Sequence, residues 1–115
     1  MTMGADILVV DDDRDIRDTL AAVLDGEGYR VRCAENGAQA LAMLHGPKPS
    51  AIVLDLMMPV MSGWELLDAF HDDAELCRIP VVVLSAVRAP GALTHLAKPV
   101  SMEELVTTLD HICRH

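Results

Sequence analysis

The chain has 115 residues and a formal net charge of −9, with 51% hydrophobic and 23% charged residues. This length supports one domain with its own core, and the negative charge disfavours direct binding to the phosphates of nucleic acids. The apolar stretches are too short to cross a bilayer and no signal peptide is recognisable, so we expect a cytoplasmic protein without membrane contact.

Apolar runs that fit strands alternate along the chain with segments of helical periodicity, which is typical of βαβ units and a parallel sheet. The first strand is expected at residues 7–10 and the first helix at residues 14–26, with Asp13 as its N-cap. The inner face of this helix is predicted to carry four aliphatic residues, Ile16, Leu20, Val23 and Leu24.

The second strand, at residues 29–34, is more polar and is expected at an edge of the sheet. Asn36 can cap a second helix that runs to about His45. The third strand is expected at residues 51–54, as an apolar run that fits a fully buried position, and the fourth at residues 80–84.

Two capping boxes mark the starts of later helices. Ser62 and Glu65 predict a helix after the third strand, and Ser101 and Glu104 predict the final helix, after a fifth strand at residues 94–97. The inner face of the final helix is predicted to carry Leu105, Leu109 and Ile112.

Polar residues stand at the ends of these apolar runs. Asp11 and Asp12 follow the first strand, Asp55 the third, Ser85 the fourth and Lys98 the fifth. Because the carboxyl ends of parallel strands lie along one edge, these side chains are expected to meet there. Carboxylates bind Mg²⁺, a carboxylate can accept a phosphoryl group, and an ammonium neutralises charge on phosphoryl oxygens. The pattern therefore predicts a site for a divalent cation and a phosphoryl group.

Four segments, ILVVDDD, IVLDLMMPVMSG, VVVLSA and AKP, resemble the signature of the response-regulator receiver domain of two-component signalling. The resemblance covers nearly the whole chain. It implies a single doubly wound α/β domain of the flavodoxin-like class, with a five-stranded parallel sheet of order 2-1-3-4-5. We expect one receiver domain over residues 1–115 and no output domain, so that output runs through protein–protein contacts or phosphoryl relay.

The resemblance also implies a cofactor and a partner. Asp55 matches the phospho-acceptor, which takes its phosphoryl group from a sensor histidine kinase. Asp11 and Asp12 match the acidic pair that binds Mg²⁺, together with Asp55 and the main-chain carbonyl of Met57. A receiver of this kind is not an enzyme beyond its own phosphorylation and dephosphorylation.

Three further positions match residues that sense the phosphoryl group. By the resemblance, Ser85 is the switch hydroxyl, Lys98 contacts the phosphate, and His95 stands at the position of the aromatic switch residue. A downstream protein or a phosphotransfer partner then responds to the rearranged surface.

The connection from Ser85 to Lys98 is short. If the fifth strand takes about four residues, only residues 86–93 remain, fewer than the ~10–12 that a crossover with a helix normally needs. We predict that the fourth helix is absent or reduced to about one turn. The apolar sheet surface that it would leave suggests a homodimer or another partner protein at this place.

Two other functions stay open on the sequence. The short connection would also fit a pseudo-receiver, which keeps the fold and binds partners without phosphorylation. The pair Asp11 and Asp13 after an apolar strand also resembles the nucleophile motif of haloacid-dehalogenase-type phosphatases, with Asp11 as nucleophile, although the final segment, residues 101–115, supplies no further acidic pair of that family.

Overall fold

The structure is a computed structural model. It describes residues 5–55, 65, 68–69, 72–84, 94–96 and 102–113. Within these ranges only the backbone is described for Asp55, Cys77, Met102 and residues 94–96.

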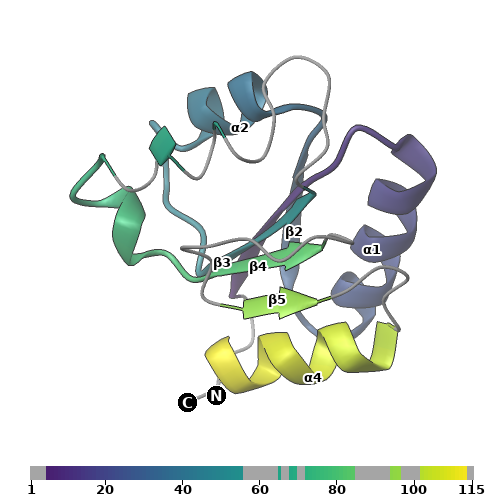
Figure 1. The fold of residues 1–115 in the computed structure, drawn as a ribbon. Coiled ribbons are helices and arrows are strands. Elements are labelled where there is room, and N and C mark those ends of the chain that lie inside the picture. The colour runs from purple at the N-terminus through teal and green to yellow at the C-terminus, as the bar shows by residue number, and fades with distance from the viewer. Residues whose placement is uncertain are drawn as a thin grey trace.

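Five strands of the described chain lie in one parallel sheet (Figure 1). They are β1 (Asp6–Val10), β2 (Arg30–Ala34), β3 (Ala51–Asp55), β4 (Val81–Leu84) and β5 (Thr94–Leu96). The sheet runs in the order β2, β1, β3, β4, which confirms the predicted order of the first four strands, and β5 pairs with β4. The predicted reduction of the fourth helix concerns residues 86–93, which lie outside the described residues.

Helices cover both faces of the sheet. The helices with described bounds are α1 (Arg14–Gly26), α2 (Gly37–Met43), α4 (Met102–Cys113) and a short 3₁₀-helix, η1 (Leu76–Arg78), which precedes β4. Residues 65 and 68–69 are helical as well. Figure 1 shows α2 on one face of the sheet and α1 and α4 on the other. No helix in these described segments combines the length and the apolar character that a membrane span requires.

The side chains that cap the first two helices are those predicted from the sequence. The Asp13 carboxylate accepts hydrogen bonds from the backbone N–H groups of Asp15 and Ile16, at 2.9 and 3.2 Å. The Asn36 side chain accepts one from the N–H of Gln39 at 2.8 Å. These bonds satisfy N–H groups that have no partner inside the helix, and they fix where each helix begins.

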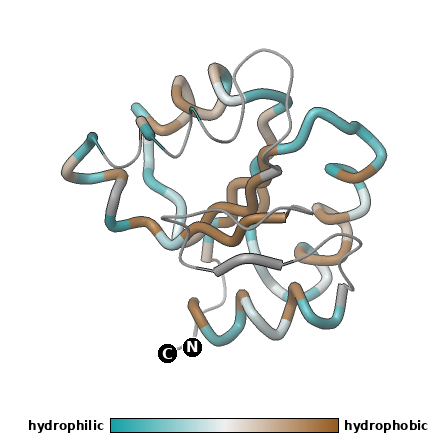
Figure 2. The backbone as a smooth tube through the Cα atoms, viewed as in Figure 1, coloured by the Kyte–Doolittle hydropathy of each residue, from teal (hydrophilic) through white to brown (hydrophobic). Residues whose placement is uncertain are grey.

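The core has two halves because successive strand residues point to opposite faces of the sheet. Leu8 and Val10 on β1 pack toward α2, whereas Ile7 and Val9 pack toward α1 and α4. All four are fully buried. Figure 2 shows the strands β1, β3 and β4 as a continuous hydrophobic centre. A central strand buried on both faces explains why the sequence shows unbroken apolar runs instead of alternation.

One predicted core position is wrong. Leu20 and Leu24 on α1 are buried, but Ile16 on the same helix is 37% exposed. The first turn of α1 lies past the carboxyl end of β1 (Figure 1). Helical periodicity identifies which face of a helix points toward the core, but it does not show how far along the helix the sheet extends.

A hydrogen bond joins two distant parts of the chain. The buried hydroxyl of Tyr29, just before β2, donates to the Asp110 carboxylate on α4. Tyr29 belongs to the core half that α4 covers. The bond therefore fixes the final helix to the beginning of the fold.

Replacing Tyr29 with phenylalanine keeps the ring buried and removes the donor. We expect the free energy of unfolding to fall by about 1–3 kcal/mol, because the Asp110 carboxylate loses a charge-assisted hydrogen bond. Urea unfolding followed by circular dichroism measures the change. In a double-mutant cycle with Asp110→Asn, the combined loss should be smaller than the sum of the single losses, and strict additivity would contradict the coupling.

Asp73 begins the turn that leads into η1. Its carboxylate accepts hydrogen bonds from the backbone N–H groups of Glu75 and Leu76, at 2.8 and 3.0 Å. These two bonds are the main reason that the pKa of Asp73 lies below its ordinary value, and the positive charges of Lys48 and His45 lower it further. The ionised carboxylate therefore holds this turn.

The lowered pKa of Asp73 gives its contribution to stability a defined pH dependence. The contribution is fully present above the ordinary carboxyl pKa of about 4 and is lost as the pH falls through the lowered value. The difference in urea midpoint between the wild type and Asp73→Asn should therefore shrink as the pH falls below about 4. A difference that grows on acidification would contradict this assignment.

Candidate functional site

The strands of the sheet end level with one another at one edge. The last paired residues of neighbouring strands are Val10 with Leu54, Asp55 with Leu84, and Leu84 with Leu96. Asp11 directly follows Val10, so its backbone stands beside that of Asp55 at the end of β3. The register therefore brings the two predicted acidic positions to one place at the carboxyl edge.

Asp11 is held by contacts of its backbone and of its side chain. Its N–H donates to the Ala34 carbonyl at 3.1 Å, and its own carbonyl accepts from the Arg17 guanidinium at 2.8 Å. Its Oδ1 atom accepts from the N–H of Asp13 at 2.9 Å. The side chain is only 2% exposed, so the Asp11 carboxylate is a fixed group at the end of the central strand.

The three consecutive aspartates have different environments. Asp11 is buried, Asp12 is exposed, and Asp13 is occupied as the N-cap of α1. Asp11 and Asp12 thus supply two adjacent carboxylates, which are the hard oxygen ligands that a divalent cation such as Mg²⁺ prefers. The donor types at the end of β1 fit the predicted metal.

The remaining predicted site residues fall outside what the structure describes. The backbone of Asp55 ends β3, but its side chain is not among the described groups, and Met57, Ser85 and Lys98 lie outside the described residues. His95 is placed only as a backbone position in β5. Among the described side chains, no three His, Cys, Asp or Glu residues gather into a metal-binding group.

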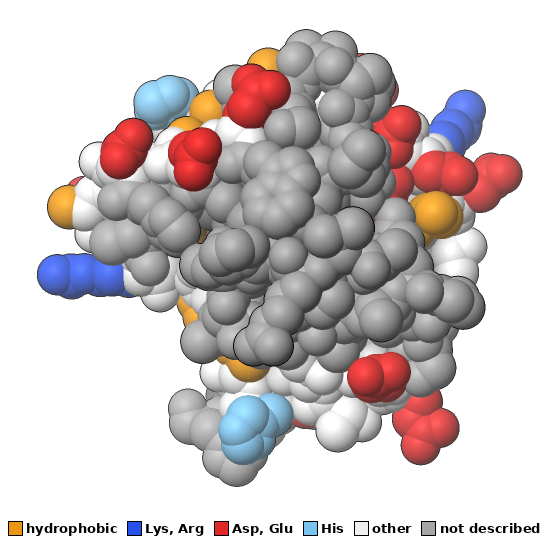
Figure 3. Space-filling view, viewed as in Figure 1, with side chains coloured by type: hydrophobic (Ala, Val, Ile, Leu, Met, Phe, Trp, Pro, Cys, Tyr) orange, Lys and Arg blue, Asp and Glu red, His pale blue; other side chains and the backbone are white. Residues whose placement is uncertain are grey.

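Acidic side chains surround the start of α1. Asp12, Asp13, Asp15 and Asp18 are exposed here, and Figure 3 shows red acidic groups gathered at this end of the helix. Arg14 lies 3.7 Å from Asp18, but both side chains are highly exposed, so water and salt screen this ion pair. The surface next to Asp11 is therefore negative and favours the approach of cations.

Arg17 contacts the candidate site, and the sequence analysis did not single it out. From the second turn of α1 its guanidinium reaches back to the carbonyl of Asp11. Its charge also lowers the pKa of the Cys33 thiol on β2, although burial has the larger effect and raises that pKa, and Asp18 raises it too. No motif marks Arg17, because its role depends on how α1 packs beside the end of β1.

The response regulator receiver domain family matches residues 7–110. The chain belongs to this family. This receiver domain is 36% identical over 121 aligned residues to the response regulator MprA of Mycobacterium ulcerans (strain Agy99), in an alignment that covers 97% of the chain and 51% of that relative. The chain spans about half the length of the curated relatives it matches.

Solved structures show the same fold. The chemotaxis protein CheY4 of Vibrio cholerae is 31% identical with a TM-score of 0.86, and the match covers 95% of this chain and 98% of that one. The response regulator TrrA of Thermotoga maritima, solved in complex with Mg²⁺-BeF, is 29% identical with a TM-score of 0.84, covering 94% and 98%. The receiver domain is therefore a CheY-like signalling module of two-component systems and not a classical enzyme.

Proposed function

We propose that this receiver domain accepts a phosphoryl group on Asp55 from a phosphohistidine of a sensor histidine kinase, with Mg²⁺ as cofactor. One observation carries the proposal. The sheet register sets the end of β3, at Asp55, beside the buried and firmly held Asp11. An acceptor carboxylate and a metal-binding carboxylate at neighbouring strand ends are the arrangement that phosphoryl transfer to aspartate needs.

The transfer is a substitution at phosphorus. An oxygen of the Asp55 carboxylate attacks the phosphorus atom, an O–P bond forms, and the P–N bond to the donor imidazole breaks with its electron pair leaving on nitrogen. Asp11, Asp12, Asp55 and the main-chain carbonyl of Met57 would hold Mg²⁺, which would supply positive charge to the phosphoryl oxygens.

The chain itself contributes order and charge. Arg17 and Asp13 hold Asp11 through its carbonyl and its carboxylate, so this ligand does not have to reorganise when the phosphoryl group arrives. In the proposal, Lys98 neutralises a second phosphoryl oxygen and Ser85 donates to a third. Both follow strands that end level with β3.

Acetyl phosphate with Mg²⁺ tests the acceptor without a kinase. The intact mass of the wild type should rise by one phosphoryl group, whereas the isosteric variant Asp55→Asn should stay unmodified. Persistent modification of that variant would assign the acceptor elsewhere. Beryllofluoride with Mg²⁺, the pair present in the TrrA structure, gives a second measurement that needs no covalent step.

The outcome also separates this function from the two alternatives. A pseudo-receiver would gain no mass in acetyl phosphate and would bind no beryllofluoride. A phosphatase would turn over a generic phosphate ester and lose that activity in Asp11→Asn instead of Asp55→Asn. The burial of Asp11, which is 2% exposed, favours a metal ligand over a nucleophile that must reach the substrate.

The proposal also includes how phosphorylation of Asp55 is signalled to a partner protein. Phosphorylation would be reported by Ser85 and His95 to a downstream protein, to a phosphotransfer partner or to a second copy of the chain. The short connection at residues 86–93 is the proposed place of a homodimer contact. Sedimentation of the phosphorylated and unphosphorylated protein measures this directly, and a monomer in both states at high concentration would rule out self-association.

A further inference from the structure

A cavity of about 490 Å³ lies between α2 and η1, away from the carboxyl edge. It is situated where α2 ends ahead of β3 and where η1 leads into β4, and therefore beside the amino ends of these strands. Its volume falls within the range of ~300–1,000 Å³ that is usual for small-molecule sites. The described residues around it divide into an aliphatic floor and a charged rim.

The floor is part of the core. It consists of Leu41 from α2, Leu44 at the C-cap of α2, Leu76 from η1, and Ala69. Leu44 and Leu76 are 2% and 8% exposed and belong to the same core cluster as Leu8 on β1. An apolar group in the cavity would therefore rest on side chains that the fold already holds in place.

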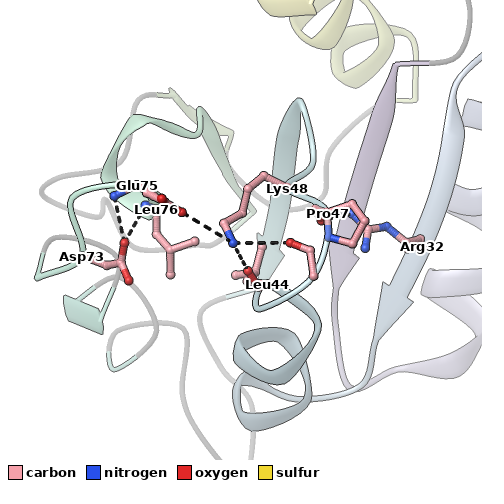
Figure 4. A network of polar contacts seen from close by, with 8 residues as sticks. Arg32, Leu44, Pro47, Lys48, Asp73, Glu75 and Leu76 are labelled. Carbon is pink, nitrogen blue, oxygen red and sulfur yellow. Dashed lines mark hydrogen bonds and ion pairs between the residues drawn. The ribbon is translucent and has the colours of Figure 1, made fainter.

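Lys48 supplies the positive charge of the rim (Figure 4), and His45 lines the cavity as well. The Lys48 ammonium donates to the Leu44 carbonyl and, at 3.4 Å, to the Gly46 carbonyl, which fixes it at the end of α2. Its third contact, to the Glu75 carboxylate, is 3.8 Å long, beyond hydrogen-bond distance. One N–H of the ammonium thus remains for a closer acceptor.

The negative side of the rim is formed by Asp73 and Glu75. The Asp73 carboxylate is held by the N–H groups of Glu75 and Leu76, as Figure 4 shows. The Lys48 Nζ atom lies 3.8 Å from the Glu75 carboxylate, so an ion pair joins the positive and the negative side of the rim (Figure 4). Charges of both signs therefore stand next to each other at the mouth of one apolar cavity.

We propose that this cavity binds a free α-amino acid with an apolar side chain. The side chain would rest on Leu44 and Leu76, the carboxylate would lie toward Lys48 and His45, and the ammonium toward Asp73 and Glu75. A free amino acid carries both charges on one carbon next to an apolar group, which matches a rim of both signs above an aliphatic floor. This inference does not depend on phosphorylation of Asp55.

Titration with L-leucine, followed by amide chemical shifts of the ¹⁵N-labelled protein, tests the proposal. Saturable shifts are expected at residues 41–48 and 73–76, with a dissociation constant on the order of 1 mM for so small a ligand in an open site. N-acetyl-leucine lacks the ammonium and leucinamide lacks the carboxylate, so each should bind about two- to fivefold more weakly. Equal binding of all three compounds, or no saturable shift, would overturn the proposal.

A pair of variants locates the site. Glu75→Gln removes one rim charge from a side chain that is 79% exposed and leaves the backbone of η1 unchanged, so we expect weaker leucine binding by about two- to fivefold. Asp25→Asn makes the same change on α1, on the opposite face of the sheet, and should leave binding unchanged. If both variants bind leucine like the wild type, the ligand does not use this rim and the assignment is wrong.

Discussion

Asp11→Asn is expected to weaken Mg²⁺ binding at least about tenfold and to slow phosphorylation of Asp55 by acetyl phosphate to a similar degree. The asparagine oxygen can still accept the hydrogen bond from the N–H of Asp13, so the local fold is kept. What is lost is a negative charge at a position that is 2% exposed, where water screens it poorly. Isothermal titration calorimetry and time-resolved intact mass give the two readouts.

Asp13→Asn is the matched control. It makes the same chemical change two residues away, and asparagine caps a helix as well as aspartate does, so α1 should keep its N-cap. We expect Mg²⁺ affinity and phosphorylation rate within about twofold of the wild type, since the Asp13 carboxylate is exposed, is screened by water and serves as the N-cap instead of as a ligand. Equal losses in Asp11→Asn and Asp13→Asn would mean that the total negative charge matters instead of a specific ligand.

Leu24→Ala should have the largest effect on stability. Leu24 is fully buried in the core half beneath α1 and α4, and its truncation leaves a cavity that the packed neighbours fill only in part. The free energy of unfolding should fall by about 3–4 kcal/mol, a large share of the ~5–15 kcal/mol that holds a domain of this size folded. Urea denaturation followed by circular dichroism at constant m-value measures it.

Ile16→Ala provides the comparison within the same helix. Ile16 is 37% exposed, and we expect its truncation to cost less than about 1 kcal/mol. If Leu24→Ala and Ile16→Ala lower the free energy of unfolding by similar amounts, Ile16 is buried in solution. The inner face predicted from helical periodicity would then be correct.

The strands and the helix starts could be predicted because their causes are local. β1, β3 and β4 are buried on both faces, so each is an unbroken apolar run that a reader of the sequence can find. Asp13 and Asn36 cap their helices through hydrogen bonds to residues at most three positions away. Acidic residues that follow different strands come together at one edge because the strands are parallel. The alternation of strands and helices along the sequence already indicates this parallel arrangement.

The rest depends on contacts between distant residues. Tyr29 was expected as an ordinary strand residue, but β2 begins at Arg30, and the Tyr29 hydroxyl binds Asp110, a residue 81 positions away. Ile16 has the helical spacing of a core residue, but it lies on the first turn of α1, past the end of β1, and is 37% exposed. Lys48 stands after a Gly-Pro turn that signals a loop, and nothing local indicates its contacts to α2 and Glu75.

The position of β1 bears on how the chain acquires its fold during translation. β1 leaves the ribosome before its two neighbours in the sheet, because it pairs with β2 on one side and β3 on the other. The face that carries Ile7 and Val9 is completed by Leu105 and Leu109 of α4, near the other end of the chain. At ~5–20 residues per second, the nascent strand must wait roughly 5–20 s for that cover. Throughout this interval an apolar surface is open to chaperones and to neighbouring nascent chains.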